Sequence, residues 1–177
     1  ASGCSFAIWK EDFIKIGGFD ETIFLYHDDV DFSIRAHLMG YNILFVPSST
    51  VKHNYTLNVT AQKLYHLERG RYIILRKYYS LYDIAKISPS LFVAELLAFG
   101  YALNLGYPGL RSCLQGMREG LTVKVQRISG DKEKLLRSIS AKIPEGQLTN
   151  STVSRMAVFF ANRLFEVNSR LLRKGLV

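Results

Sequence analysis

The sequence has few cysteines, no signal-peptide pattern and no block of like charge. Its two cysteines, Cys4 and Cys113, lie far apart, so a disulfide framework is not expected and a reducing cytosol fits better. No basic segment followed by an apolar run is present at the start, and we interpret the sequons at Asn54, Asn58 and Asn150 as chance. No arm rich in Lys and Arg occurs, so nucleic acid is not an expected partner. These absences favour a cytoplasmic protein.

The composition is that of a folded, basic chain. Of the 177 residues, 48% are hydrophobic, which is enough for a sizeable core. The length suits one domain, or one domain with an appendage. The formal net charge is +8, which permits an anionic partner such as a nucleotide or an anionic membrane surface.

The first part of the chain alternates between strand-like and helix-like patterns. Residues 5–9 form a short apolar run, and residues 41–47, YNILFVP, form a continuous one that suits a buried parallel strand. Between them, residues 11–16 are typical of a helical turn, and the four-residue apolar spacing predicts a helix over residues 28–40. This alternation predicts an α/β fold with part of a sheet in residues 1–58.

The remainder, residues 59–177, is predicted to be helical. The very apolar stretch 88–109 is marginal in length for a bilayer span. The last helix is amphipathic, and we expect its apolar face to pack against the rest of the protein. That face contains Val153, Met156, Phe160, Leu164, Val167 and Leu171. The predicted helices are residues 61–85, 88–109, 109–121, 131–143 and 151–175.

Three carboxylates are crowded together in the motif HDDVD, at Asp28, Asp29 and Asp31. A helix N-terminus in solvent accounts for such a cluster, because the helix dipole favours acids there. The aromatic residues just before it favour a pocket instead, since such side chains form a wall beside the acids. They are Phe19, Phe24 and Tyr26. Asp31 and Arg35 have the i, i+4 spacing of a helix-stabilising ion pair.

The stretch from Ser2 to His53 resembles the acceptor-side half of a family 2 glycosyltransferase with the GT-A fold. The resemblance is carried by SGCSFAIWK, GGFDE, FLYHDDVD with Arg35 four residues on, GYNILFV and VKH. The later HLERGRYIILRKYY is similar to the Arg-rich helix of rhamnosyltransferase-like members. The resemblance therefore implies a partial GT-A, Rossmann-like sheet region in residues 1–58, followed by an all-helical C-terminal extension.

The same resemblance implies roles for individual residues. Asp29 matches the general base that accepts a proton from the acceptor hydroxyl. Asp28 stands where the family usually has Glu, so its carboxylate reaches less far. His53 matches a histidine that ligates the divalent metal in some members; from its position alone, a structural or surface histidine is the commoner case. The residues implied to line the acceptor site are Asp20, Glu21, Phe24, Tyr26 and Asp28.

The resemblance also implies what such a chain would act on. The partners are a nucleotide-sugar donor and a glycan or glycolipid acceptor, with inversion at the sugar. The cofactor is a divalent metal, Mn²⁺ or Mg²⁺, bound mainly by an N-terminal half that carries an Asp-x-Asp motif. No Asp-x-Asp precedes Asp29 here. The 177 residues are therefore expected to be a piece of a longer transferase and to be inactive alone.

Two other functions compete with sugar transfer. One is a non-catalytic interaction module that docks a partner or the inner face of the cell membrane through its helices. The other is a metal-dependent phosphohydrolase using His27 and the following acids, which ranks last because no further histidines precede the cluster at helical spacing. No oligomeric state is implied by the sequence.

Overall fold

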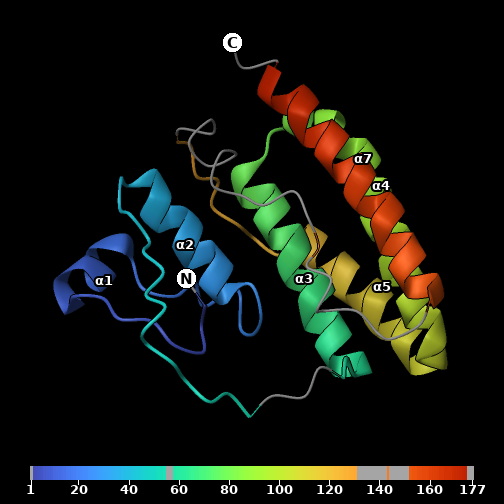
Figure 1. Ribbon diagram of the computed structural model, residues 1–177, viewed down its shortest axis with the longest axis horizontal. Helices are drawn as coiled ribbons and strands as arrows, with labels where there is room; N and C mark the ends of the chain where they lie inside the picture. The colour runs from blue at the N-terminus through green and yellow to red at the C-terminus, as the bar shows by residue number, and fades with distance from the viewer. Residues whose placement is uncertain (1, 55–57, 131–142, 144–151, 175–177) are drawn as a thin grey trace.

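The computed structural model describes residues 2–54, 58–130, 143 and 152–174. Figure 1 shows α1 and α2 on one side and α3, α4, α5 and α7 on the other, with α2 beside α3. The helices are α1 (Lys10–Ile16), α2 (Asp28–Leu38), α3 (Ala61–Tyr78), α4 (Leu81–Asn104), α5 (Gly106–Thr122) and α7 (Thr152–Lys174).

The predicted α/β fold is wrong: the described residues contain helices and no strand, and the expected partial Rossmann-like sheet of a GT-A fold is not seen. The isolated bridge between Ser2 and Ser5 is the nearest approach to strand pairing in this part of the chain. A strand requires backbone hydrogen bonds to a neighbouring strand, and residues 6–9 and 41–47 are irregular segments without such pairing. Leu44 and Phe45, expected to be buried, are 81% and 89% exposed.

The helices α1 and α2 are held together by an aromatic cluster. Phe32 of α2 packs against Phe13 of α1, with 5.2 Å between ring centroids, and Phe6 and Phe19 complete the group. Gly17 ends α1 in the left-handed region, at φ +94°, which glycine adopts without strain. This cluster fixes the start of α2 relative to the N-terminal residues.

The break between α3 and α4 differs from the prediction. The sequence pattern predicts one helix that continues to residue 85 and another that begins near Pro89. Instead α3 ends at Tyr78, and α4 begins at Leu81 behind a capping box between Ser80 and Asp83. Pro89 lies inside α4. The capping box satisfies backbone N–H groups at the new helix start, which favours a break there.

The pair α3 and α5 has the most extensive helix packing in the described part of the chain. Gly116 and Gly120 of α5 lie directly against the backbone of α3. A Cβ atom at Gly116 would lie 2.4 Å from the carbonyl oxygen of Tyr65, and one at Gly120 would lie 2.6 Å from that of Arg69. The two backbones approach this closely because these α5 positions carry no side chain.

The last helix, α7, packs along α4. Asn168 of α7 donates to the carbonyl oxygen of Lys86 and also hydrogen-bonds Ser90. The predicted helix is thus confirmed, whereas the expectation that its apolar face is buried is wrong: Met156, Phe160 and Val167 are exposed. The predicted helix 131–143 lies, but for residue 143, outside the described residues.

Candidate functional site

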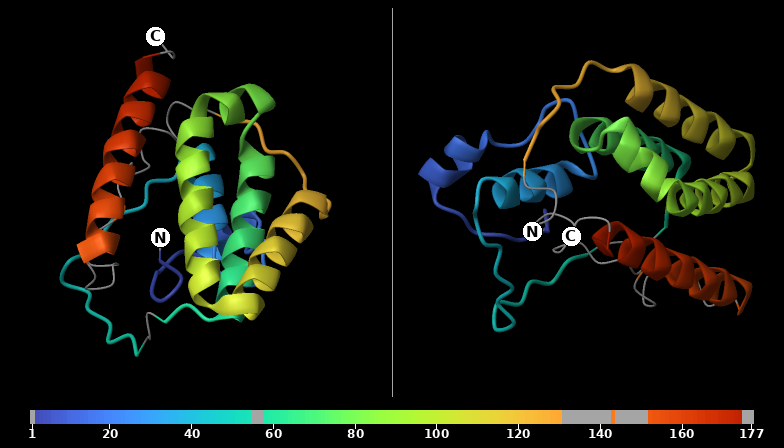
Figure 2. Two further views of the ribbon diagram at one scale, coloured as in Figure 1. Left: turned by 90° about the vertical axis from the view of Figure 1, so that its right-hand side faces the viewer. Right: turned by 90° about the horizontal axis from the view of Figure 1, so that it is seen from above.

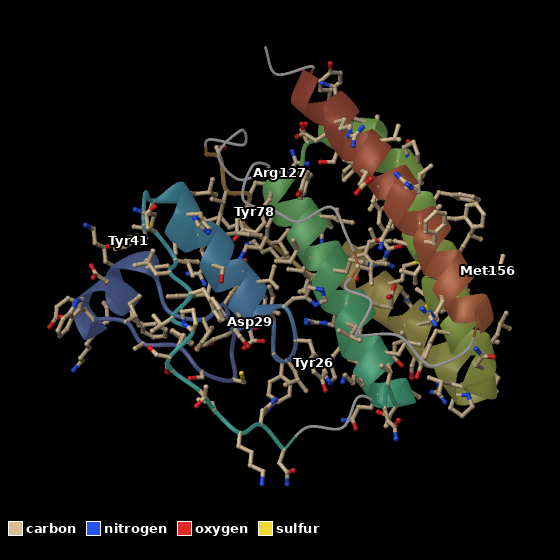
Figure 3. All side chains as sticks on the ribbon, in the orientation of Figure 1. Tyr26, Asp29, Tyr41, Tyr78, Arg127 and Met156 are labelled. Atoms are coloured by element: carbon tan, nitrogen blue, oxygen red, sulfur yellow. The ribbon has the colours of Figure 1, made fainter. Side chains whose placement is uncertain are left out.

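The acidic cluster lies at the first turn of α2, as the sequence predicts. Asp28 and Asp29 are its first two residues, and both are half-buried. Their carboxylates are close to the free N–H groups of the helix start, a position that stabilises negative charge. Figure 3 shows Asp29 at this turn, with Tyr26 on the loop that leads into it.

The carboxylate of Asp29 is held in place by the N-terminal residues. Its Oδ2 accepts a hydrogen bond from the backbone N–H of Gly3, at 2.8 Å. A Cβ atom at Gly3 would already be 3.4 Å from that same oxygen, so the two segments are in van der Waals contact. One oxygen of Asp29 is therefore oriented by the protein.

The two residues before the cluster have an unusual backbone. Tyr26 and His27 have φ values of 58° and 67°, in the left-handed region that non-glycine residues rarely adopt. His27 packs on Gly70 of α3, and a Cβ atom added at Gly70 would lie 2.8 Å from Nδ1 of His27. The carbonyl oxygen of His27 accepts from the N–H of Asp31 at 2.8 Å, which begins α2. Strained backbone of this kind is concentrated at functional sites.

His27 is a half-buried histidine whose surroundings favour the neutral imidazole. Burial lowers its pKa below the usual value, although the carboxylates of Asp29 and Asp28 oppose that shift. Its Nδ1 is buried and makes no hydrogen bond within the described part of the chain. No role in sugar transfer is predicted for His27 from the sequence. His27 lies between the acids and α3, at the residue that precedes the first turn of α2.

The predicted aromatic wall is divided between two places. Phe19 belongs to the aromatic cluster of α1 and α2, whereas Phe24 and Tyr26 lie on the loop against the start of α3. Phe24 is 75% exposed and its ring centroid is 5.8 Å from that of His66. The ammonium of Lys63 lies 5.3 Å from the centre of the Tyr26 ring. Of the three predicted aromatic residues, Phe24 and Tyr26 lie on the loop that leads into the acidic cluster, and Phe19 does not.

Asp20 and Glu21 differ in their surroundings. Glu21 is exposed. Both oxygens of Asp20 are engaged within the protein: Oδ1 accepts from the backbone and hydroxyl of Thr22, and Oδ2 accepts from Lys77 at 2.5 Å. Burial alone would raise the pKa of Asp20, but the hydrogen bonds from Lys77 and Thr22 outweigh it and lower the pKa to about 2.

The third acid, Asp31, is the centre of a buried polar network of which the sequence predicts only a part. The predicted ion pair is confirmed, with Nε of Arg35 at 2.9 Å from Oδ2 of Asp31. Lys77 and Tyr78 of α3 bond to Oδ1, at 2.5 and 2.7 Å. Arg35 also donates to the carbonyl oxygen of Gly18, at 2.6 Å. Asp31 therefore joins α2 to α3.

The described residues do not fit a metal centre by themselves. They contain no group of three or more His, Cys, Asp or Glu side chains placed to hold a metal ion. His53 is exposed on the irregular segment after Val51. Its role as a metal ligand stays a prediction, and the proton transfer proposed for this site does not depend on it.

The arrangement can support proton abstraction. A carboxylate anchored through one oxygen at a helix start can accept a proton from a hydroxyl group placed within hydrogen-bond distance of its other oxygen. Asp29 meets this description, and the loop residues Phe24 and Tyr26 lie on the same stretch of chain.

Comparison with known proteins identifies similar sequences. Over 77 residues, 42% of this chain, it is 32% identical to the N-acetylglucosaminyl-diphospho-decaprenol L-rhamnosyltransferases of two Mycobacterium tuberculosis strains, CDC 1551 / Oshkosh and H37Rv. The chain is similar to a glycosyltransferase. The aligned part is 25% of each relative, so the chain spans about a quarter of their length. No protein-family profile matches the chain. No solved structure matches it either.

Proposed function

We propose that this chain carries the acceptor-activating part of an inverting glycosyltransferase, with Asp29 as its general base. The observation that carries the proposal is the 2.8 Å hydrogen bond from the N–H of Gly3 to Oδ2 of Asp29, which orients the carboxylate at the start of α2. The similarity to two rhamnosyltransferases supports the same reaction class.

In the proposed step, Asp29 accepts the proton of an acceptor hydroxyl while the hydroxyl oxygen bonds to the anomeric carbon of the donor sugar. The bond from that carbon to the nucleotide diphosphate breaks, and the diphosphate leaves with the electron pair. Such positioned proton transfer contributes a factor of about 10² to 10⁴ in rate. The acceptor is proposed to be a glycan or glycolipid, bound beside Asp28, Glu21, Phe24 and Tyr26.

Asp20 enters this proposal indirectly. Because both of its carboxylate oxygens are bonded within the protein, it shapes the turn that carries Glu21 and Thr22. We propose that donor binding relies on residues outside these 177, and that the 177 residues alone do not turn over a nucleotide sugar. No Asp-x-Asp precedes Asp29 in the sequence, which supports this expectation.

The test uses the polypeptide encoded by the complete gene. The names of the relatives suggest the first pair to try: a nucleotide-activated L-rhamnose as donor, and a polyprenyl-diphosphate-linked N-acetylglucosamine as acceptor. We expect Asp29→Asn to lower kcat by about 10² to 10⁴, the range for loss of a general base, with the thermal midpoint unchanged. Glu11→Gln, at an exposed position on α1, is the control and should keep full activity.

Three results would contradict parts of the proposal. Wild-type kcat in Asp29→Asn would remove this residue as the base. Failure of the complete, folded protein to use any donor in a panel of nucleotide sugars would remove sugar transfer itself. Turnover by the 177-residue chain alone would contradict the expectation that the donor site needs further residues.

A further inference from the structure

The outward face of α4 is an apolar stripe. Its large side chains are 56% to 79% exposed and recur at spacings that place them on one side of a helix. No exposed residue of α4 is charged. Over these residues the helix is about 33 Å long, at 1.5 Å per residue. The α4 stripe consists of Leu81, Tyr82, Phe92, Leu96 and Leu103.

The neighbouring helix, α7, also exposes apolar and cationic side chains. In the left view of Figure 2, α4 lies in front of the other helices, with α7 alongside it. Phe159 and Phe160 of α7 are exposed. Arg155, Arg163 and Arg170 are exposed on the same helix, and the guanidinium of Arg163 lies 5.5 Å from the centre of the Phe159 ring. Helices that lie at a membrane surface are typically rich in both basic residues and Trp, Phe or Leu.

Outside the stripe, α4 carries a carboxylate that is bonded to α3. Glu95 accepts from Arg71 at 2.9 Å and from the hydroxyl of Tyr72 at 2.6 Å. Glu68, also paired with Arg71, is buried beside them. By length and composition α4 could cross a membrane. Crossing would carry these charged groups into hydrocarbon, at a cost of several kcal/mol or more, so the contacts with α3 favour a helix that lies in the interface.

The charge of the chain indicates which kind of surface it meets. The net charge is +8, α4 exposes no acid, and α7 exposes the three arginines named above. Lys86 lies 4.3 Å from the centre of the Tyr82 ring, so a cation and an amphipathic aromatic also meet at the N-terminal end of the stripe. Each basic residue near an anionic bilayer adds about 1 kcal/mol of attraction.

We propose that the α4 stripe, with the exposed face of α7, docks on the surface of an anionic lipid bilayer. The stripe inserts its apolar side chains into the boundary between head groups and acyl chains, and the α7 arginines bind the lipid phosphates. This inference is independent of sugar transfer.

The experiment measures binding of the complete protein to vesicles by flotation. One set is phosphatidylcholine alone and the other contains phosphatidylglycerol as well. We expect binding to the anionic vesicles, weakened by added salt. The double variant Phe92→Ser/Leu96→Ser should bind at least about tenfold more weakly, since it removes two large apolar side chains that the bilayer would bury. Ile14→Ser, at an exposed apolar position on α1, is the matched control and should bind like the wild type.

Further experiments test the role of the α7 arginines and the alternative that a second copy of the chain covers the α4 stripe. Arg163→Gln/Arg170→Gln should reduce the preference for phosphatidylglycerol and leave the folded state intact, because both side chains are exposed. Binding to neither vesicle, or equal binding by the stripe variant, would overturn the proposal. A dimer in solution that the stripe variant dissociates, together with no vesicle binding, would assign the stripe to a second copy of the chain instead.

Discussion

The ammonium of Lys77 on α3 lies 2.5 Å from Oδ1 of Asp31 on α2, and both side chains are buried. The same ammonium bonds to Asp20 on the loop after α1. A single cation thus joins the turn before the candidate site, the helix that carries Asp29, and the helical part of the molecule. The position of the candidate base depends on this link, because Asp31 is the α2 residue to which both Lys77 and Tyr78 of α3 bond.

Lys77→Met should therefore strongly destabilise the protein. The substitution removes one of the two cations paired with the buried carboxylate of Asp31 and leaves only Arg35, and loss of a partner from a buried ion pair costs up to about 3–5 kcal/mol. Urea unfolding followed by circular dichroism measures the change in the free energy of unfolding.

Lys15→Met is the control for this prediction. Lys15 lies in the last turn of α1 and is exposed, so its replacement should change the free energy of unfolding by no more than about 0.5 kcal/mol. A loss below about 1 kcal/mol for Lys77→Met would show that the buried link does not have the strength expected of a buried pair.

The second prediction concerns the stability of the protein at acidic pH. The pKa of Asp20 is about 2, below its ordinary value of 3.8, so the folded state favours the charged form. This stabilisation is complete above about pH 4 and is lost as the pH falls through about 2. Asp20→Asn should destabilise the protein at neutral pH, and the difference from wild type should shrink between pH 4 and pH 2. Unfolding free energies measured across that range test it; a constant difference would contradict it.

Most helices of this fold can be predicted from the sequence because their signals are local. The apolar spacing over residues 28–40 and the glycine at position 40 place α2 correctly. The break between α3 and α4 also has a local signal, since Ser80 followed by Asp83 is a capping pattern, but Pro89 is an equally local signal for a later helix start. The apolar run 41–47 predicts a buried strand but does not identify the segment with which it would pair. In the described residues this run forms no strand.

The candidate site can be predicted where its contacts are close in sequence. The pair of Asp31 and Arg35 follows from i, i+4 spacing. The bonds from Lys77 to Asp20 and Asp31 join residues 57 and 46 positions apart, and no local pattern encodes such distant pairing. The one local hint is a lysine within the apolar stretch that ends α3. The contact between Gly3 and Asp29 is not predictable for the same reason.

The third prediction concerns the two cysteines, both of which are free thiols. Burial raises the pKa of Cys113 to about 11, so its thiol is neutral at pH 8 and shielded from reagents. Cys4 is exposed. Iodoacetamide at pH 8 should modify Cys4 in the native protein and Cys113 only after denaturation, as peptide mass spectrometry would show. Native Cys4→Ser protein should stay unlabelled; rapid labelling of its Cys113 would disprove the buried position.

The last prediction compares two glycines inside helices. Gly116→Ala places a Cβ atom 2.4 Å from the carbonyl oxygen of Tyr65, so α5 must move away from α3, and overpacking of this kind costs about 1–3 kcal/mol. At Gly100 of α4, no atom of the described residues lies within 4 Å of the same added carbon, and Gly100→Ala should stabilise the helix by about 0.5–1 kcal/mol. Thermal unfolding of the two variants should shift in opposite directions. Stabilisation of both variants would mean that α3 and α5 do not approach as closely as the 2.4 Å distance indicates, because helix propensity alone favours alanine at both positions. Destabilisation of both would contradict the open surroundings of Gly100.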